Sequence, residues 1–335
     1  MLRFNYNIYS FIVLQLILLI ICLLLKNKKV KRYLLIIYLF IFSIYMGGRE
    51  FNIGTDTLNY VEEYLNGDGG YFSEQGFKYL GYILYELGFT PTMYLIVISL
   101  INTYVHYKGY LLNIKNREEI YIIIFFALFT ATSLFGYVNI LRQSIAGGFL
   151  LLFIGCERRK YYMRGLLYLI LGFLFHKTII FFLLLYVSKL EKIYLKFRLK
   201  GKYMVIVATL FFANIIPYFL KWHPKFNSYL IRESNNSFYI KLLLLLLFYI
   251  FISVKKISLK SEYILFYGLI LVLLFSKFEL LSSRLLYYIS GYIPIVYLEV
   301  IKKIKKIKRV MYFFNIVYQV IILWYPSVVD MFKLK

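Results

Sequence analysis

Charged residues are scarce in this chain of 335 residues: they make up 17% of it, whereas 61% of the residues are apolar. Acidic residues are the scarcer kind, with 16 Asp and Glu against 40 Lys and Arg. Soluble globular chains are usually closer to one quarter charged and one half apolar. The scarcity of charge therefore excludes a soluble enzyme, and the abundance of apolar residues excludes a disordered chain.

Cysteine is also nearly absent, since only Cys22 and Cys156 occur, with no metal or disulfide spacing. This excludes a disulfide-stapled scaffold. What is present is a series of apolar runs near 20 residues, the length that a membrane-crossing helix needs. We therefore predict an all-α fold: a polytopic integral membrane helical bundle, formed by a single domain over residues 1–335.

The net charge of +24 is the second strong feature. A similar surplus occurs in nucleic-acid-binding proteins. Here the basic residues stand in short clusters between apolar runs, as they do in cytoplasmic loops of membrane proteins, so we expect no nucleic-acid partner. The first apolar run, 8–25, is followed by Lys26, Lys28 and Lys29 rather than by a cleavage site. We interpret it as a retained helix.

We expect about ten full spans and one broken segment. The apolar run 165–187 contains His176 and Lys177 near its centre, where a single span would bury both in the membrane. A short broken hairpin that enters and leaves on the same side avoids this. The expected full spans are 8–25, 33–47, 92–112, 120–136, 139–155, 203–220, 238–254, 262–277, 284–301 and 310–326.

The distribution of Lys and Arg favours the hairpin. Beyond residue 187, the loops on one side of the expected spans hold 15 basic residues and those on the other side hold 7. A single crossing at 165–187 would make the two halves of the chain disagree about which side is positive. With the hairpin, all basic loops share the cytoplasm and both termini lie outside. The sizeable loop 47–91, which carries seven of the sixteen acids, is then external.

No familiar catalytic motif occurs, neither a phosphate-binding glycine-lysine loop nor a zinc-binding HExxH. The candidates are polar residues near the outer ends of the expected spans, where ionisable groups are costly and often functional. An arginine there can also simply reach lipid phosphates, and a buried histidine can simply bond a neighbouring helix. The candidates are Arg49, Asp56, Arg142, Gln143, His176, Lys177, Arg284, Tyr287 and Tyr288.

Several arginines at membrane depth suit a ligand with an anionic head and an apolar tail, such as a polyprenyl diphosphate. The planar guanidinium matches phosphate oxygens and stays charged at all relevant pH values. Arg142 shortly precedes Gly147 and Gly148, where small residues would let helices approach closely. Asp56 stands in a turn-like cluster with Gly54 that could present its carboxylate inward.

The stretch Arg49-Glu50-Phe51-Asn52-Ile53-Gly54-Thr55-Asp56-Thr57-Leu58-Asn59-Tyr60 resembles the EpsG family of exopolysaccharide polymerases, relatives of the Wzy-type polymerases of O-antigen and capsule. Further stretches resemble the family in order along most of the chain. They are Glu74-Gln75-Gly76-Phe77, Leu141-Arg142-Gln143-Ser144-Ile145-Ala146, Phe175-His176-Lys177-Thr178, and Ser283-Arg284 with Tyr287-Tyr288. The usual proline or similar residue near Glu74 is absent, so we expect Glu74 to matter less than Asp56.

The resemblance implies a glycosyltransferase that joins lipid-linked oligosaccharide repeat units on the outer face of the bacterial cytoplasmic membrane. The growing chain would leave its polyprenyl diphosphate, typically undecaprenyl diphosphate, and pass to a hydroxyl of the next unit. Such a step needs a base and a stabilised leaving group. We predict Asp56 or His176 as the base, with Asp56 first. For substrate binding we predict Arg142 and Arg284, then Arg49, together with Gln143, Lys177, Tyr60 and Tyr288.

Neither a metal nor another cofactor is expected, because no metal-ligand cluster is visible and arginine can carry the charge. Expected partners are the lipid-linked oligosaccharide, membrane lipid, and a chain-length regulator and flippase of the same pathway. Two alternatives stay open. A transporter or flippase of lipid-linked sugars could use the same cationic cavity, but should show repeated halves with matching broken helices. A non-catalytic membrane subunit would have no need of the buried ionisable residues.

Overall fold

A computed structural model describes residues 27–54, 56–66, 74–114, 131–186, 199–220, 236–254 and 261–303, with single positions at 17, 21, 25, 120 and 124. Every regular element in these ranges is helical, which confirms the all-α prediction. The chain forms two compact units that divide between Lys177 and Thr178. We describe each unit by itself, and the prediction of a single domain over residues 1–335 stays a prediction.

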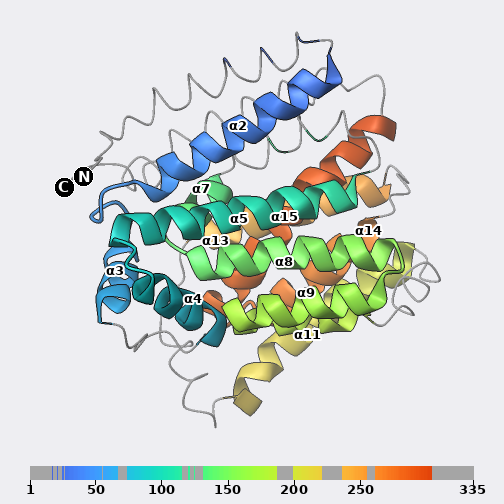
Figure 1. Cartoon of the computed structure of the whole chain (residues 1–335). Coiled ribbons are helices and arrows are strands. Elements are labelled where there is room, and N and C mark those ends of the chain that lie inside the picture. The colour runs from blue at the N-terminus through green and yellow to red at the C-terminus, as the bar shows by residue number, and fades with distance from the viewer. Residues whose placement is uncertain are drawn as a thin grey trace. The chain divides into compact units, whose positions relative to one another are not determined.

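In its described residues, the N-terminal unit is a bundle of four long helices with three shorter ones. The long helices are α2 (Lys28–Gly47), α5 (Pro91–Asn113), α8 (Leu141–Arg158) and α9 (Tyr162–Phe175). The shorter ones are α3 (Thr57–Leu65), α4 (Gln75–Glu86) and α7 (Ala131–Val138). Along the bundle α5 and α8 run parallel, while α2 and α9 run antiparallel to their neighbours (Figure 1).

Close backbone approach holds the long helices together. A Cβ atom built on Gly148 would overlap the side chain of Val105, and one built on Gly47 would lie 2.7 Å from the backbone nitrogen of Ile96. Small residues at such positions are typical of helix pairs in membranes. The close packing expected near Gly148 is therefore confirmed. Because α5 and α8 begin at the same end as α2 and α9 finish, four helix termini gather there.

The stretch 47–91, expected as a loop, contains the two amphipathic helices α3 and α4, which cover this end of the bundle (Figure 1). Tyr60 and Tyr64, one turn apart on α3, turn inward, as does Phe77 on α4. Tyr64 stacks on Tyr94 of α5 with ring centroids 4.3 Å apart. A search for long apolar runs does not detect short helices of this kind, because only one face of each helix is apolar and buried.

Among the described residues, α2 alone has the length and apolarity of a membrane-crossing helix. Its 20 residues extend about 30 Å at 1.5 Å per residue. Shorter apolar helices occur at Tyr162–Phe175, Gly201–Ile215, Leu242–Val254 and Glu262–Leu274. The expected spans 8–25 and 310–326 and most of 120–136 lie outside the described residues. The ten-span topology therefore stays a prediction.

The predicted break inside 165–187 is confirmed. Helix α9 ends at Phe175, His176 has an extended backbone, and a 3₁₀ helix, η1, follows over Lys177–Tyr186. Long 3₁₀ runs are uncommon, which marks this segment as irregular. Whether the chain then returns to the side from which it came stays a prediction.

The C-terminal unit is also a helical bundle. It contains α11 (Leu199–Leu220), α13 (Asn236–Val254), α14 (Glu262–Leu274) and α15 (Glu279–Lys303). Helix α14 packs against the other three. Polar contacts lie at its start: Lys202 Nζ is 3.2 Å from the carboxylate of Glu262, and Ser261 Oγ donates to Glu299 at 2.8 Å.

Candidate functional site

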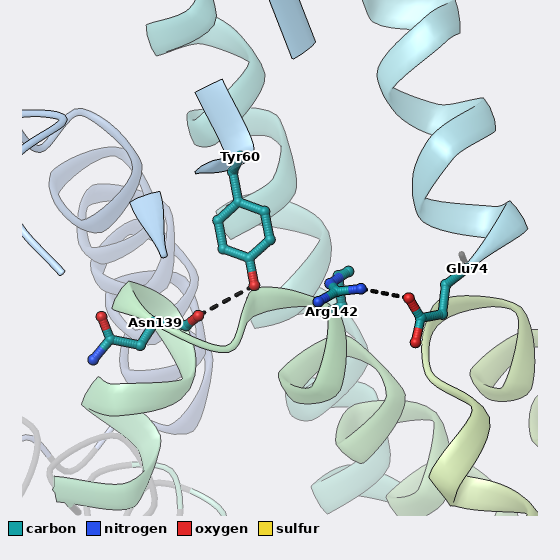
Figure 2. Close-up of polar contacts among 4 residues, drawn as sticks. All are labelled: Tyr60, Glu74, Asn139 and Arg142. Atoms are coloured by element: carbon teal, nitrogen blue, oxygen red, sulfur yellow. Dashed lines mark hydrogen bonds and ion pairs between the residues drawn. The ribbon is translucent and has the colours of Figure 1, made fainter. Parts of the chain in front are cut away.

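Arg142 and Glu74 form an ion pair where α8 and α4 begin. Arg142 is the second residue of α8, and Glu74 immediately precedes α4. Their side chains are 15% and 11% exposed, respectively, so the pair is largely shielded from solvent. Figure 2 shows the guanidinium between Glu74 and the ring of Tyr60. An arginine so placed, at a helix end and only partly exposed, can bind an oxyanion.

Glu74 is the site residue that the sequence interpretation underweighted. The sequence predicts a smaller role for Glu74 than for Asp56, yet the Glu74 carboxylate contacts Arg142 directly. The neighbouring Gly76 explains how α4 reaches this position. A Cβ built there would lie 2.9 Å from the Cβ of Leu174, so glycine lets the start of α4 approach the end of α9. In the sequence, the motif Glu74-Gln75-Gly76 is the feature that indicates Glu74 as a site residue.

Tyr60 forms the inner wall of the site. It is buried, and its hydroxyl donates to the backbone oxygen of Asn139 at 3.1 Å (Figure 2). The pKa of Tyr60 is raised to about 12, mainly by burial and also by the nearby Asp56, while Arg142 acts in the opposite direction. The phenol therefore stays neutral at any physiological pH. It can orient and pack, but it is not a base for catalysis at neutral pH.

Arg49 lies beside this site with its donors directed into the protein. Its side chain is only 1% exposed. Nη1 donates to the backbone oxygen of Met46 at 2.6 Å, and Nη2 donates to the backbone oxygen of Val138 and to Thr57 Oγ1, both at 3.1 Å. These contacts clamp the end of α2 to α3 and α7. The predicted role of Arg49 in diphosphate binding stays a prediction.

Side chains of the stretch 49–60, which resembles the EpsG family, contact the short connection between α7 and α8. Arg49 and Thr57 both donate to the Val138 oxygen, and Tyr60 donates to the next oxygen, that of Asn139. Gly54, with φ of +90°, presses against the same connection, where a Cβ would overlap Val138. The stretch 49–60 therefore holds residues 138 and 139 in place, and in this way it positions Arg142, three residues after Asn139.

Asp56, the first candidate base, lies one turn before Tyr60 on α3. It is half-buried and stands at the N-cap, but its side chain makes no capping bond to α3. Its negative charge contributes to raising the pKa of Tyr60, after the larger effect of burial. The structure thus brings Asp56, Tyr60, Glu74 and Arg142 to one end of the N-terminal unit. The adjacent Thr55 lies outside the described residues.

His176, the second candidate base, adjoins the same end. It is 4% exposed and follows the last residue of α9, two positions after Leu174, which touches the start of α4. Lys177 is exposed and Gln143 is buried on α8. The structure therefore gathers seven of the nine predicted site residues at or beside this end. They are Arg49, Asp56, Tyr60, Arg142, Gln143, His176 and Lys177.

Arg284 and Tyr288 belong to the C-terminal unit, on α15. Arg284 is half-buried, and the hydroxyl of Tyr288 is 3.3 Å from Thr178 Oγ1. The ring of Tyr288 also packs edge-on against Phe182, with centroids 5.7 Å apart. Their participation with Arg142 in one site stays a prediction. Within the described residues, no three His, Cys, Asp or Glu side chains form a metal-binding group.

Comparison with known protein families identifies the family of this chain. The model of the EpsG family matches residues 33–332, which is most of the chain. No curated protein and no solved structure matches the sequence. The matched region contains every predicted site residue.

Proposed function

The chain belongs to the EpsG family, and from this membership we propose that it polymerises lipid-linked oligosaccharide repeat units in exopolysaccharide, capsule or O-antigen biosynthesis. The family supports exopolysaccharide polymerisation in general. One structural observation supports the finer reaction: the N-terminal unit presents Arg142 to an oxyanion, the carboxylate of Glu74, beside a second carboxylate and a histidine. A diphosphate-linked donor needs a cation of this kind and a base close to it.

The proposed step is a displacement at the anomeric carbon of the donor. A hydroxyl oxygen of the acceptor unit bonds to that carbon, and the bond to the phosphate oxygen breaks with its electron pair. The leaving polyprenyl diphosphate takes this charge, and the proposed residues that stabilise it are Arg142 and Arg284, with Arg49 as the third candidate. The hydroxyl proton passes to Asp56 or His176. Gln143, Lys177, Tyr60 and Tyr288 complete the substrate contacts.

We also propose that the protein is a multi-pass protein of the bacterial cytoplasmic membrane, with ten spans, one hairpin and its active site outside. The two ends of the N-terminal unit support this orientation. The site gathers at one end, whereas Arg158, Arg159 and Lys160 lie at the other. Basic residues favour the cytoplasmic side. Membrane lipid, a chain-length regulator and a flippase of the same pathway are the proposed partners.

Glycan analysis of a deletion strain tests the proposed function. We expect long polymer to disappear and single repeat units to remain on their lipid carrier at the outer leaflet. Units trapped at the inner leaflet would instead indicate a flippase. Polymer of normal length in the deletion strain would contradict a non-redundant polymerase role.

A further inference from the structure

Arg142 is the arginine of the N-terminal unit that is best placed to bind phosphate, and it is already paired with the carboxylate of Glu74. Glu74 Oε2 accepts from Nη1 of Arg142, and both side chains are largely shielded. On the other side, the guanidinium faces the ring of Tyr60, with its carbon 6.0 Å from the ring centroid. An anionic ligand that uses the same edge of Arg142 must therefore compete with Glu74.

The local charge makes this competition unavoidable. Arg49, Arg142 and Asp56 all act electrostatically on Tyr60, and Glu74 pairs with Arg142. The carboxylate of Glu74 offsets the charge of its partner Arg142. A diphosphate gains less attraction from a guanidinium that is already paired, and a carboxylate beside its oxygens repels it. Turning Glu74 away removes the repulsion and leaves the guanidinium of Arg142 for the ligand.

The carboxylate of Glu74 has a second possible partner, the N-terminus of α4. Glu74 stands at the N-cap of α4 with an extended backbone, and its side chain makes no capping bond to the first turn of that helix. The partial positive charge of a helix N-terminus favours a carboxylate there. Helix α4 itself is anchored, since Phe77 and Leu84 are buried and Gly76 abuts Leu174. The carboxylate can therefore change partners by side-chain rotation alone.

We propose that Glu74 is a built-in competitor for Arg142, which a donor diphosphate must displace before it binds. The inference rests on the proposed function for the identity of the donor. Every anion must overcome the same competition. Phospholipid phosphodiesters, which carry one charge and surround any site at a membrane surface, bind too weakly to displace Glu74 at ordinary occupancy. A diphosphate offers more charge and more acceptor oxygens to the guanidinium, so it still binds.

The expected effect follows from the population of the competent state. If Arg142 is released from Glu74 in about one molecule in ten, the apparent dissociation constant of any anion is raised about tenfold. Replacing Glu74 by glutamine removes the competing charge while keeping the shape of the side chain. The variant should then bind anions about tenfold more tightly.

The test uses the full-length protein, purified in an uncharged detergent. Calorimetry measures the binding of two probes, inorganic pyrophosphate and diethyl phosphate. We expect Glu74→Gln to bind both about tenfold more tightly than wild type, and Arg142→Gln to lose binding of both. Glu86→Gln is the matched control, since it removes the same charge from the far, exposed end of α4. Its affinities should equal those of wild type.

Equal or weaker pyrophosphate binding by folded Glu74→Gln would overturn the proposal, because Glu74 would then orient Arg142 rather than compete for it. If that variant does not fold, hydrogen exchange of the wild type decides. Saturating pyrophosphate should slow exchange in residues 75–78, where the released carboxylate caps α4, and leave residues 84–86 unchanged. Unchanged or faster exchange at 75–78 would equally overturn the proposal.

These measurements separate the role of Glu74 from the proposed function. A deletion strain with normal polymer, together with a tenfold gain in Glu74→Gln, would reject the polymerase function and retain the competition at Arg142. Loss of polymer in the deletion strain, without any gain in anion binding by Glu74→Gln, would retain the polymerase function and reject the competition at Arg142.

Discussion

Two arginines of the N-terminal unit have the same chemistry and different surroundings. Arg49 is buried and donates to two backbone oxygens and a threonine hydroxyl, so its charge is used inside the protein. Arg142 is partly exposed and pairs with a carboxylate. We therefore expect substitutions of Arg49 to act on stability and substitutions of Arg142 to act on polymer formation.

Arg49→Lys should lower the melting temperature of the purified protein. Lysine keeps the charge but lacks the planar fork that reaches Met46, Thr57 and Val138 together. The loss of several buried charged hydrogen bonds should lower the free energy of unfolding by about 2 kcal/mol or more. Arg32→Lys, at an exposed position on α2, is the control and should leave the melting temperature unchanged. A normal melting temperature with shortened polymer would instead support direct substrate binding by Arg49.

Arg142→Lys should shorten the polymer sharply while the protein level and melting temperature hold. The variant keeps one positive charge but cannot offer two parallel donors to phosphate oxygens. Gel analysis of surface glycan in a complemented deletion strain measures the effect, with Arg32→Lys as the control. Polymer of full length from both Arg142→Lys and Arg284→Lys would reject a bidentate arginine role.

The two candidate bases can be separated by paired variants and by pH. Asp56→Asn and His176→Gln each keep a polar side chain that cannot accept the proton. We expect Asp56→Asn to abolish turnover of purified lipid-linked units and His176→Gln to reduce it less. Imidazoles ordinarily titrate at about pH 6.5 and carboxylates well below, so a carboxylate base predicts a rate that holds in mildly acidic medium. The opposite ranking, with a rate that falls below about pH 6, would assign the base to His176.

At the scale of elements, the pairing of α5 with α8 sets where Arg142 lies. The two helices approach through glycines: a Cβ on Gly148 would overlap Val105, and one on Gly155 would lie 2.6 Å from the Cβ of Leu112. Because α8 is held along its length, its first turn has a defined position against α3 and α4. Substitutions far from Arg142 on this interface should therefore change both stability and activity.

Gly148→Leu should prevent accumulation of the folded protein. The larger side chain has no space against Val105, and forced overpacking costs about 1–3 kcal/mol or more. Gly291→Ala is the control, because a Cβ there meets nothing within 4 Å and alanine favours a helix. Protein level and melting temperature in detergent measure both. Normal folding of Gly148→Leu would show that α5 and α8 do not pack as closely as the structure indicates.

At the scale of the whole molecule, the two ends of the N-terminal unit have opposite character. One end holds Glu74 and Asp56 together with Arg49 and Arg142. At the other end, Arg159 Nε donates to the backbone oxygen of Leu112 at 2.9 Å and so caps α5. Basic side chains at a helix C-terminus are favourable because they meet the negative end of the helix dipole. Basic residues near the ends of spans also favour the cytoplasmic side.

The proposed orientation predicts a labelling pattern for two positions outside the described residues. After Cys22 and Cys156 are replaced, Lys192→Cys should resist an impermeant maleimide in intact cells and Ser228→Cys should react. The expectation follows from the 15 basic residues on one side of the C-terminal spans against 7 on the other. Both should react in opened cells, which controls for burial. Labelling of position 192 but not 228 would contradict the hairpin and reverse every later loop.

Several features of this protein could be predicted from sequence because they are local. Composition and apolar runs predict helices, since each helix satisfies its own backbone and needs only an apolar face. A His-Lys pair inside an apolar run predicts the break after Phe175, where the helix does end. Gly148 predicts close helix packing because a residue without a side chain lets a neighbouring helix approach its backbone, whichever helix that is.

Only the tertiary structure decided which polar residues meet. Glu74 and Arg142 are 68 positions apart, and Arg49 and Val138 are 89 apart. No periodicity in the sequence relates residues at such separations. The sequence by itself determined the helices, the break and the set of ionisable candidates, because these depend on neighbours along the chain. Folding decided that Arg49 faces inward, that Glu74 pairs with Arg142 and that the family motif clamps residues 138–139, because these depend on which helix ends gather at one end of the bundle.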